Sequence, residues 1–393
     1  MAISTAGELD ADFADRGRLL LGRDCHEAQL RKVYALESNC SLCIGSIQLK
    51  NEKTHRFAAA RTTPAGELDR SFADGGYLLG EPAQVSVHRF SGLASSDQGE
   101  LMLVGNVADK SRDELLRCTA HGQCLNRWQL TAPGAKSNTT HPMITTGHGG
   151  CLWLCSSTMH NGKCGGALYR RLPGGERDDA FADNGTLDFC LDNTYVRFND
   201  LAITDEQGHL VVAADIHPWT SSDSSLTLCC FDRDSGEVVS AFGANGRFTY
   251  PPSHSLYRLL SIQRVIATRH GLLVIIQSYD GQGAIYSCFI RVTEQGELDG
   301  SFNAGKPIVI AGAYSDVAVQ SDDRIIVLAS NLYPDTVVRR YLVNGEKDCS
   351  FGNRGEVLLG QPGERFYALA VQVDDKILVS GVGRSSVLYR LQG

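Results

Sequence analysis

The stretch GELDADFADRG, residues 7–17, returns along the chain as GELDRSFADGG at 66–76 and GERDDAFADNG at 175–185. We call this segment the repeat motif. Its first glycine occurs at Gly7, Gly66, Gly175, Gly236, Gly296 and Gly345. A phenylalanine follows six residues later in each copy, at Phe13, Phe72, Phe181, Phe242, Phe302 and Phe351. A second glycine closes the motif, so a fixed local structure is expected at regular intervals.

One interval between copies is twice as long as the others, which indicates a degenerate copy inside it. GQCLNRW at 122–128 fits this place, with Leu125 at the usual aspartate position and Trp128 at the aromatic position. Repeats then begin near residues 7, 66, 122, 175, 236, 296 and 345, at intervals of 59, 56, 53, 61, 60 and 49 residues. A period of this size indicates a repeat architecture.

Each repeat contains short runs of apolar and β-branched residues that end at Gly, Asp or Asn. The last repeat has FYALAVQ, KILVSG and SSVLYRL, and apolar runs such as GEVLLG follow the motif elsewhere. This pattern is typical of strands, and no long segment has helical periodicity. Four strands in each of seven repeats predict an all-β fold, a seven-bladed β-propeller of four-stranded antiparallel blades. A β-solenoid is the rival architecture.

The order of strands at the two ends favours a closed ring. The first repeat contributes only a fourth strand, GRLLLG at 17–22, whereas the chain ends after a third strand, SSVLYRL. Together these segments complete one blade, so the N-terminal strand is predicted to close the last blade and leave no free sheet edge. The chain is therefore expected to be a single propeller domain, residues 1–393.

The pattern RyxxxGxLDxxFgxxG resembles the delta-60 repeat of bacterial β-propeller proteins. The repeats that carry it extend over nearly the whole chain. The copy at 122–128 departs most from it. Because that family carries no single activity, the resemblance implies the fold and says little about function.

An arginine precedes the motif by five residues in several repeats, and an aspartate lies three residues into it. In the copy at Gly236 both are lost together, to Phe231 and Val239, which suggests that the two side chains touch. We therefore predict structural ion pairs that brace the turn, with the motif phenylalanine filling the gap between blades. The predicted pairs are Arg61–Asp69, Arg170–Asp178, Arg291–Asp299, Arg340–Asp348 and, joining the two ends of the chain, Arg390–Asp10.

Composition limits the choice of partners and compartment. The net charge is −8 and no Lys/Arg-rich run occurs, so a nucleic-acid partner is not expected. No signal-like segment and no apolar run long enough to cross a bilayer is found, so neither export nor a membrane partner is expected. Thirteen irregularly spaced cysteines are then interpreted as reduced thiols in a cytoplasmic protein, with leaderless secretion as the alternative.

Candidate functional residues come from the loops opposite the motif, which vary in length and composition. His26, His88, His141 and His254 occupy comparable connections between blades, and Tyr257, Arg258, Tyr314, Arg365 and Tyr367 lie near the starts of innermost strands. Such imidazoles could act as general acid and base, or hold a divalent metal ion through His88, His141 and His254. The simpler interpretation is ordinary polar loops and a hydrated channel mouth.

Cysteine-rich stretches such as 148–164 lack the paired CxxC spacing of a structural zinc site, and no nucleophile elbow, phosphate loop or HExxH motif occurs. The leading prediction is a non-enzymatic binding module whose variable loop rim holds a protein, peptide or glycan. The alternative is an enzyme with its active site at the channel mouth, a metal-dependent or histidine-based lyase, epimerase or hydrolase. Fold alone does not choose between them.

Overall fold

The computed structural model of the chain describes residues 5–22, 24–80, 89–95, 100–107, 112–130, 136–137, 143–146, 152–160, 163–191, 193–204, 208–218, 225–250, 258–280, 282–330 and 336–393. It divides into two compact units. The first comprises residues 1–88, 121–123 and 312–393, and the second comprises residues 89–120 and 124–311. The described residues form strands and short 3-10 turns, and none of their helices is long and apolar enough to cross a membrane.

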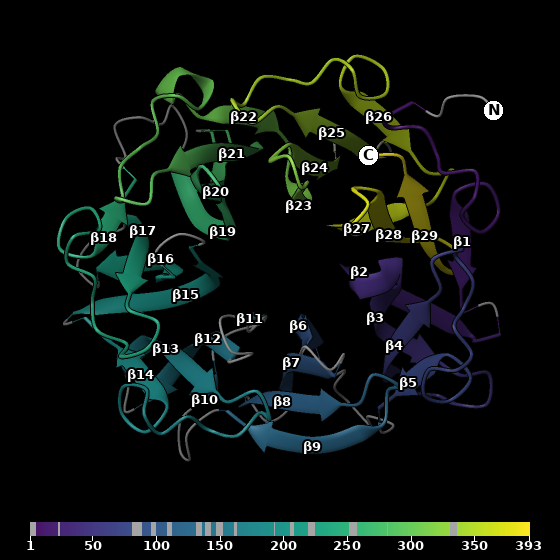
Figure 1. Ribbon diagram of the computed structural model, residues 1–393, viewed down its shortest axis with the longest axis horizontal. Coiled ribbons are helices and arrows are strands. Elements are labelled where there is room, and N and C mark those ends of the chain that lie inside the picture. Colours follow the sequence, from purple (N-terminus) through teal and green to yellow (C-terminus); the bar gives the residue numbers. More distant parts are fainter. Residues whose placement is uncertain are drawn as a thin grey trace. The chain divides into compact units, whose positions relative to one another are not determined.

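The first unit contains three antiparallel sheets of four strands each, in the orders β2-β3-β4-β5, β23-β24-β25-β26 and β1-β29-β28-β27 (Figure 1). Its elements are β1 (Arg18–Leu21), β2 (Glu27–Ala35), η1 (Glu37–Asn39), β3 (Ser41–Gln48), β4 (Arg56–Thr62), β5 (Tyr77–Leu79), β23 (Tyr314–Val319), β24 (Ile325–Ser330), β25 (Thr336–Tyr341), β26 (Glu356–Leu359), β27 (Arg365–Val371), β28 (Ile377–Val382) and β29 (Ser386–Leu391).

The second unit contains four antiparallel sheets, in the orders β6-β7-β8-β9, β10-β12-β13-β14 with β11 also on β12, β15-β16-β17-β18 and β19-β20-β21-β22. Its elements are β6 (Arg89–Ser95), β7 (Leu101–Val107), β8 (Arg112–Cys118), β9 (Cys124–Gln129), β10 (Lys136–Ser137), β11 (Met143–Thr146), β12 (Leu152–His160), β13 (Lys163–Arg171), β14 (Thr186–Phe189), β15 (Thr194–Ile203), β16 (Leu210–Pro218), β17 (Ser225–Phe231), β18 (Arg247–Thr249), β19 (Arg258–Thr268), β20 (Gly271–Tyr279), β21 (Ile285–Val292), η4 (Asn303–Gly305) and β22 (Ile308–Ala311).

Six of these sheets have four antiparallel strands; five of them pair strands in chain order, and the sixth pairs β27, β28 and β29 in this order and adds β1 beside β29. This is the blade of a β-propeller, so the expected all-β propeller fold with four-stranded antiparallel blades is confirmed. The expectation of seven such blades is wrong for one sheet, which has five strands. There the first-strand position is divided between β10 and β11, which pair with successive parts of β12.

The N-terminal strand β1 belongs to the sheet formed by the end of the chain. It pairs antiparallel with β29, in the register Arg18 opposite Tyr389 to Leu21 opposite Ser386. The edge of β29 is therefore covered by a segment that lies far away in the sequence.

Apolar side chains fill the space between neighbouring sheets within each unit. In the first unit, Leu30 of β2 shares a core with Ala368, Leu378 and Leu388 of the last sheet. Burial of such an aliphatic side chain stabilises the fold by about 1.5–3 kcal/mol. Strands covered on both faces read as continuous apolar runs, which is the pattern that made them recognisable in the sequence.

In six sheets one edge strand is irregular. These edge strands are β2, β6, β15, β19, β23 and β27. Each contains at least one β-bulge, at the residues Arg31, Ser91, Asn199, Leu260, Gln263, Ser315 and Tyr367. A bulge inserts one unpaired residue and changes the direction of its side chain. At each bulge, one side chain therefore points in a direction that the regular alternation of the strand would not give it.

Candidate functional site

The repeat motif forms a structural brace. The five predicted Arg–Asp pairs are all present, with Nε to Oδ2 distances of 2.7 Å for Arg61–Asp69, 3.1 Å for Arg170–Asp178, 2.5 Å for Arg291–Asp299, 2.7 Å for Arg340–Asp348 and 2.7 Å for Arg390–Asp10. In four of them the guanidinium also lies over the motif phenylalanine, 4.4–5.0 Å from the ring centroid. The arginine thus joins the ion pair to the buried ring.

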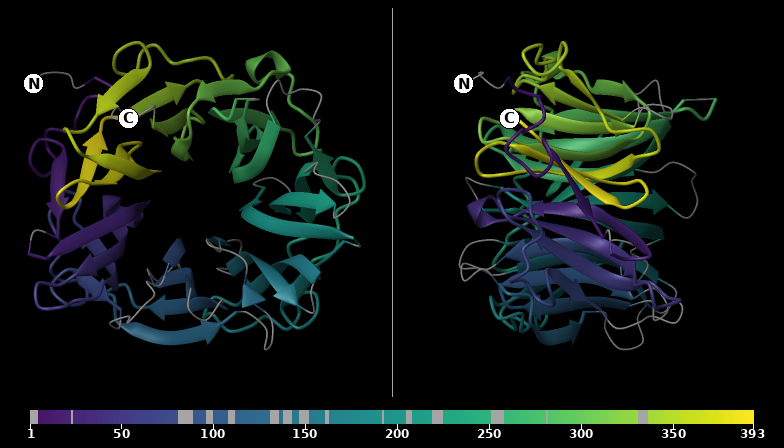
Figure 2. Two further views of the ribbon diagram at one scale, coloured as in Figure 1. Left: turned by 180° about the vertical axis from the view of Figure 1, so that it is seen from behind. Right: turned by 90° about the vertical axis from the view of Figure 1, so that its right-hand side faces the viewer.

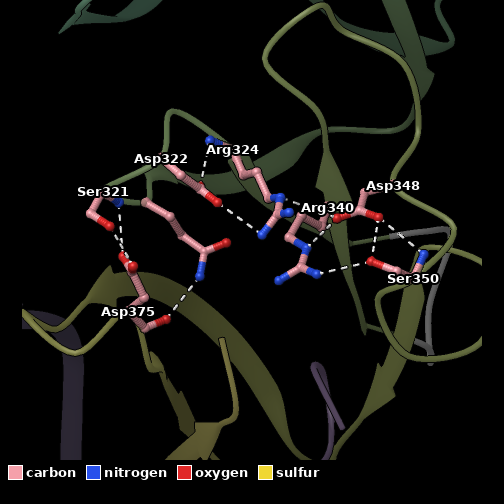
Figure 3. Close-up of polar contacts among 8 residues, drawn as sticks. Ser321, Asp322, Arg324, Arg340, Asp348, Ser350 and Asp375 are labelled. Carbon is pink, nitrogen blue, oxygen red and sulfur yellow. Dashed lines mark hydrogen bonds and ion pairs between the residues drawn. The ribbon is translucent and has the colours of Figure 1, made fainter.

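A serine completes the brace in three copies. Figure 3 shows one of them, where Asp348 Oδ1 accepts hydrogen bonds from the amide and hydroxyl of Ser350, at 3.0 and 2.6 Å. Arg340 Nη2 donates to the same hydroxyl at 3.3 Å. Burial alone would raise the pKa of Asp348, but the serine hydrogen bonds and the Arg340 charge outweigh it and hold that pKa below its usual range.

The two copies that lost the brace have replaced it. In the degenerate copy, Arg117 pairs with Glu100 at 2.8 Å, and strand β9 begins inside the motif at Cys124. In the copy at Gly236, Phe231 is 1% exposed and Val239 packs against the neighbouring core. Loss of both charges therefore leaves no unpaired ion buried there.

Successive motifs also contact one another within each unit. The amide that follows the motif phenylalanine donates to the carbonyl that precedes the next motif glycine, at 2.6–3.2 Å. The pairs are Ala14–Ala65, Ala73–His121, Ala182–Ser235, Gly243–Gln295 and Gly352–Ala6. This repeated contact is structural, and it explains why the motif recurs along the chain.

A glutamine at the end of the first strand links neighbouring turns on the same side. Gln320 Nε2 donates to the carbonyl of Asp375 at 2.8 Å. Ser321 donates its amide to the Asp375 carboxylate, also at 2.8 Å (Figure 3). Gln372 makes the equivalent bond to the carbonyl of Asn39, at 2.5 Å. These contacts hold the short turns of adjacent blades together.

Two buried aspartates on β15 and β16 fasten the next sheet of the second unit. Asp200 Oδ2 accepts the amide of Val265 at 2.9 Å, and Asp215 Oδ1 accepts that of Ile262 at 3.1 Å. Burial raises the pKa of both carboxyl groups. In the first unit Asp316 accepts the amide of Leu369 at 3.0 Å, so this use of aspartate is a structural device of the blade.

Four of the nine predicted candidates fall outside the residues that the structure describes. His88, His141, His254 and Tyr257 lie outside the described residues, and for Arg258 only its position at the start of β19 is described. No group of three or more His, Cys, Asp or Glu side chains with the geometry of a metal site occurs among the residues that are described. The predicted metal site therefore stays a prediction.

The candidates whose side chains are described lie in the first unit. His26 is exposed just before β2, Arg365 is exposed at the start of β27, and Tyr367 is the half-buried bulge residue of β27. β27 lies against β2 (Figures 1 and 2). Tyr314 begins β23, on the other side of β27.

Along β2 a row of polar side chains connects this loop end to Tyr367. We call it the β2 row: His55, Glu27, Gln29, Arg31 and Tyr367. His55 Nε2 lies 3.2 Å from Glu27 Oε2, and Gln29 Nε2 donates to Glu27 Oε1. Arg31 Nη2 donates to Gln29 Oε1 at 2.6 Å, and Arg31 Cζ lies 4.8 Å from the centroid of the Tyr367 ring. The row thus runs from a loop histidine to an aromatic ring on the adjacent sheet.

The β2 row is open to solvent and carries opposite charges. The Glu27 side chain is 44% exposed and that of His55 is 32% exposed. The hydrogen bond from Gln29, followed by the nearby His55 and His26, lowers the pKa of Glu27, so this carboxylate is ionised at neutral pH. Carboxylate, amide, imidazole and guanidinium offer both donors and acceptors, and Tyr367 adds a ring face, so the row can recognise a polar ligand.

Sequence reasoning missed Glu27, Gln29 and Arg31. A signal for them exists, because EAQLRKV alternates polar and apolar residues from Glu27 to Arg31, as a half-exposed strand does. Nothing in that alternation points to Tyr367, since the contact depends on a bulge in a different repeat.

No family model matches the chain, and no curated protein matches its sequence. Similar solved structures include the polysaccharide lyase Uly1, with a TM-score of 0.52 and 10% identity, covering 99% of this chain and 97% of that one. The extracellular domains 1–2 of Drosophila Semaphorin 1a have a TM-score of 0.52 and 9% identity, covering 95% of this chain and 87% of that one. At such identities the similarity supports the propeller fold and nothing further.

Proposed function

We propose that this protein is a non-enzymatic binding module and that the β2 row is its recognition surface, with a glycan as the ligand class. The ligand binds at the end of the blade that carries the variable loops. The observation that carries the proposal is the uninterrupted series of polar contacts from His55 to Arg31, which ends on the Tyr367 ring.

The preference for a glycan follows from the kinds of side chain in the row. Planar carboxylate, amide and guanidinium groups can pair with adjacent hydroxyls, which both donate and accept hydrogen bonds. The apolar face of an aromatic ring packs against the apolar face of a ligand. A peptide or protein ligand would instead call for a larger apolar centre in the contact surface.

We further propose that the blades are built from delta-60-like repeats. The motif-to-motif hydrogen bonds within each unit support it, as does the bond from Gly352 to Ala6, which joins the last motif to the first.

The alternative, an enzyme at the same place, has one observation in its favour. His55 and Glu27 form a pair at 3.2 Å that could serve as an acid–base couple for a lyase, epimerase or hydrolase. A divalent metal ion held by loop histidines would add to such a site. Turnover of the bound ligand distinguishes this alternative from binding alone.

The test is a glycan array probed with the full chain, followed by calorimetric titration of the selected glycan. We expect Glu27→Gln, Arg31→Ala and Tyr367→Ala each to weaken binding about tenfold or more, as expected for the loss of a charged hydrogen bond or an aromatic contact. Arg70→Ala is the matched control, because Arg70 is exposed in the motif that follows β4, at the opposite end of the same blade. Equal loss in the control, or a glycan whose affinity the row variants leave unchanged, would contradict the proposal. Chromatography of the glycan after incubation detects any turnover.

A further inference from the structure

Two cysteines face each other across a pair of strands in the second unit. Cys118 ends β8 and Cys124 begins β9, and the two residues are direct partners in the antiparallel register. Their Sγ atoms lie 3.5 Å apart, and both are free thiols. Cys118 is buried, whereas Cys124 is exposed to solvent.

This arrangement is close to the geometry of a disulfide. Paired residues of an antiparallel ladder have Cα atoms about 4.5–5.5 Å apart, which lies within the range that a disulfide spans. A bond needs the two sulfurs to approach to about 2.05 Å, which rotation of the two side chains can provide. The bulge residue Leu125 lies between the register pairs Arg117–Asn126 and Cys118–Cys124, so the regular ladder is interrupted beside the two cysteines.

The exposed thiol is also the more acidic of the two. A hydrogen bond from the Cys118 thiol stabilises the Cys124 thiolate and lowers the pKa of Cys124 to about 7, and the nearby Arg127 acts in the same direction. That same hydrogen bond, together with burial, raises the pKa of Cys118. At neutral pH the first proton therefore leaves Cys124, and the thiolate is the reactive form of cysteine.

Three buried thiols lack this combination. Burial raises the pKa of Cys43, Cys229 and Cys230 to about 12, which keeps them protonated. Cys349 is exposed in the motif of another blade, and no second thiol contacts it among the described residues. Cys349 is therefore a suitable internal reference for an exposed thiol.

We propose that Cys118 and Cys124 are a redox-sensitive dithiol, which a hydroperoxide oxidises to an intramolecular disulfide. The Cys124 thiolate attacks a peroxide oxygen; the S–O bond forms, the O–O bond breaks, and Cys124 becomes a sulfenic acid while hydroxide leaves. The Cys118 sulfur then attacks the Cys124 sulfur. The S–S bond forms, the S–O bond breaks, and the leaving hydroxide takes the Cys118 proton as water. The pair is oxidised by two electrons and the peroxide is reduced.

The proposal does not depend on the function assigned to the β2 row, and peptide mapping tests it. The full chain is treated with limiting hydrogen peroxide at pH 7, alkylated and digested with trypsin. The tryptic peptide 118–127 contains both cysteines, so a disulfide appears as an unalkylated peptide lighter by two hydrogen atoms. We expect its formation to be about tenfold faster than the oxidation of Cys349, because the lowered pKa of Cys124 increases its thiolate fraction and Cys118 Sγ lies 3.5 Å away to form the disulfide.

Two variants test which of the two thiols reacts with peroxide first. In Cys118→Ser, Cys124 is expected to accumulate as a sulfenic acid that dimedone traps. In Cys124→Ser, Cys118 is expected to resist peroxide, since it is buried. A peptide 118–127 that stays fully alkylatable after Cys349 has reacted overturns the proposal, as does peroxide reactivity of Cys118 in the Cys124→Ser variant equal to that of the wild-type pair.

Discussion

Arg390 of β29 donates from Nε to Asp10 Oδ2 at 2.7 Å, and the two side chains are only 4% and 1% exposed. The pair joins the first motif to the last strand, and Arg390 also covers the Phe13 ring. The same arginine donates to the carbonyl of Pro64, so the brace reaches the next motif as well. This side chain thus adds an ion pair, a ring contact and a hydrogen bond to the β1–β29 ladder that joins the two ends of the chain.

Removing one partner of this pair is expected to destabilise the protein strongly. Asp10→Asn leaves Arg390 buried without its counter-ion, which lowers the free energy of unfolding by about 3 kcal/mol. Urea denaturation followed by intrinsic fluorescence measures it. The control is Asp12→Asn, a neighbouring exposed carboxylate. If Asp10→Asn lowers the free energy of unfolding no more than Asp12→Asn does, the Arg390–Asp10 pair does not stabilise the contact between the two ends of the chain.

The motif aspartates predict how stability depends on pH. Burial raises their pKa values, but the serine hydrogen bonds at Asp69 and Asp348, and the arginine charge at Asp10, outweigh it, so the folded-state pKa values lie below the ordinary range. Their contribution is present above the unfolded pKa of about 3.9 and is lost as the pH falls through the folded values. We expect the urea midpoint to fall steeply below about pH 4, and less steeply in Asp348→Asn. Parallel pH profiles for the two proteins contradict this account.

The first motif glycine is expected to tolerate no side chain. Gly66 has φ +81°, and a Cβ there would lie 2.7 Å from the Phe13 ring. Gly66→Ala therefore combines backbone strain with overpacking, about 2–4 kcal/mol in total. Gly283→Ala separates the two effects, because Gly283 has φ +87° but nothing within 4 Å of the added atom, and should cost only about 1–2 kcal/mol. Equal losses in the two variants would show that Phe13 does not restrict this position.

Substitutions in the β2 row are expected to affect binding but not stability. Arg31→Ala removes a hydrogen bond and a ring contact at the surface, so the free energy of unfolding should change by less than about 0.5 kcal/mol. Tyr367→Phe keeps the ring beneath Arg31 and should retain most of the ligand affinity, whereas Tyr367→Ala should not. Calorimetry and urea denaturation on the same samples measure both properties. A large loss of stability in Arg31→Ala would mean that the row is structural.

The parts of the structure that repeat could be predicted from the sequence. The motif pairs were predictable because the same Arg and Asp positions recur in many copies and are lost together at Phe231 and Val239. The order of the predicted strands at the two ends of the chain likewise predicted the pairing of β1 with β29. Residues that recur at equivalent positions of the repeats thus predict which side chains contact one another.

Features found in a single repeat were not predictable in this way. The division of one first strand into β10 and β11 leaves no distinct pattern, since both segments are short. The contact between Arg31 and Tyr367 needs bulges in two different strands, and the position of a bulge depends on packing between sheets.

The most direct test of the proposed function is a crystal structure of the chain with the array-selected glycan bound. The account predicts sugar hydroxyls within hydrogen-bonding distance of Glu27, Gln29 or Arg31, and a sugar ring against Tyr367. A glycan bound at another surface, with the β2 row uncontacted, would contradict it.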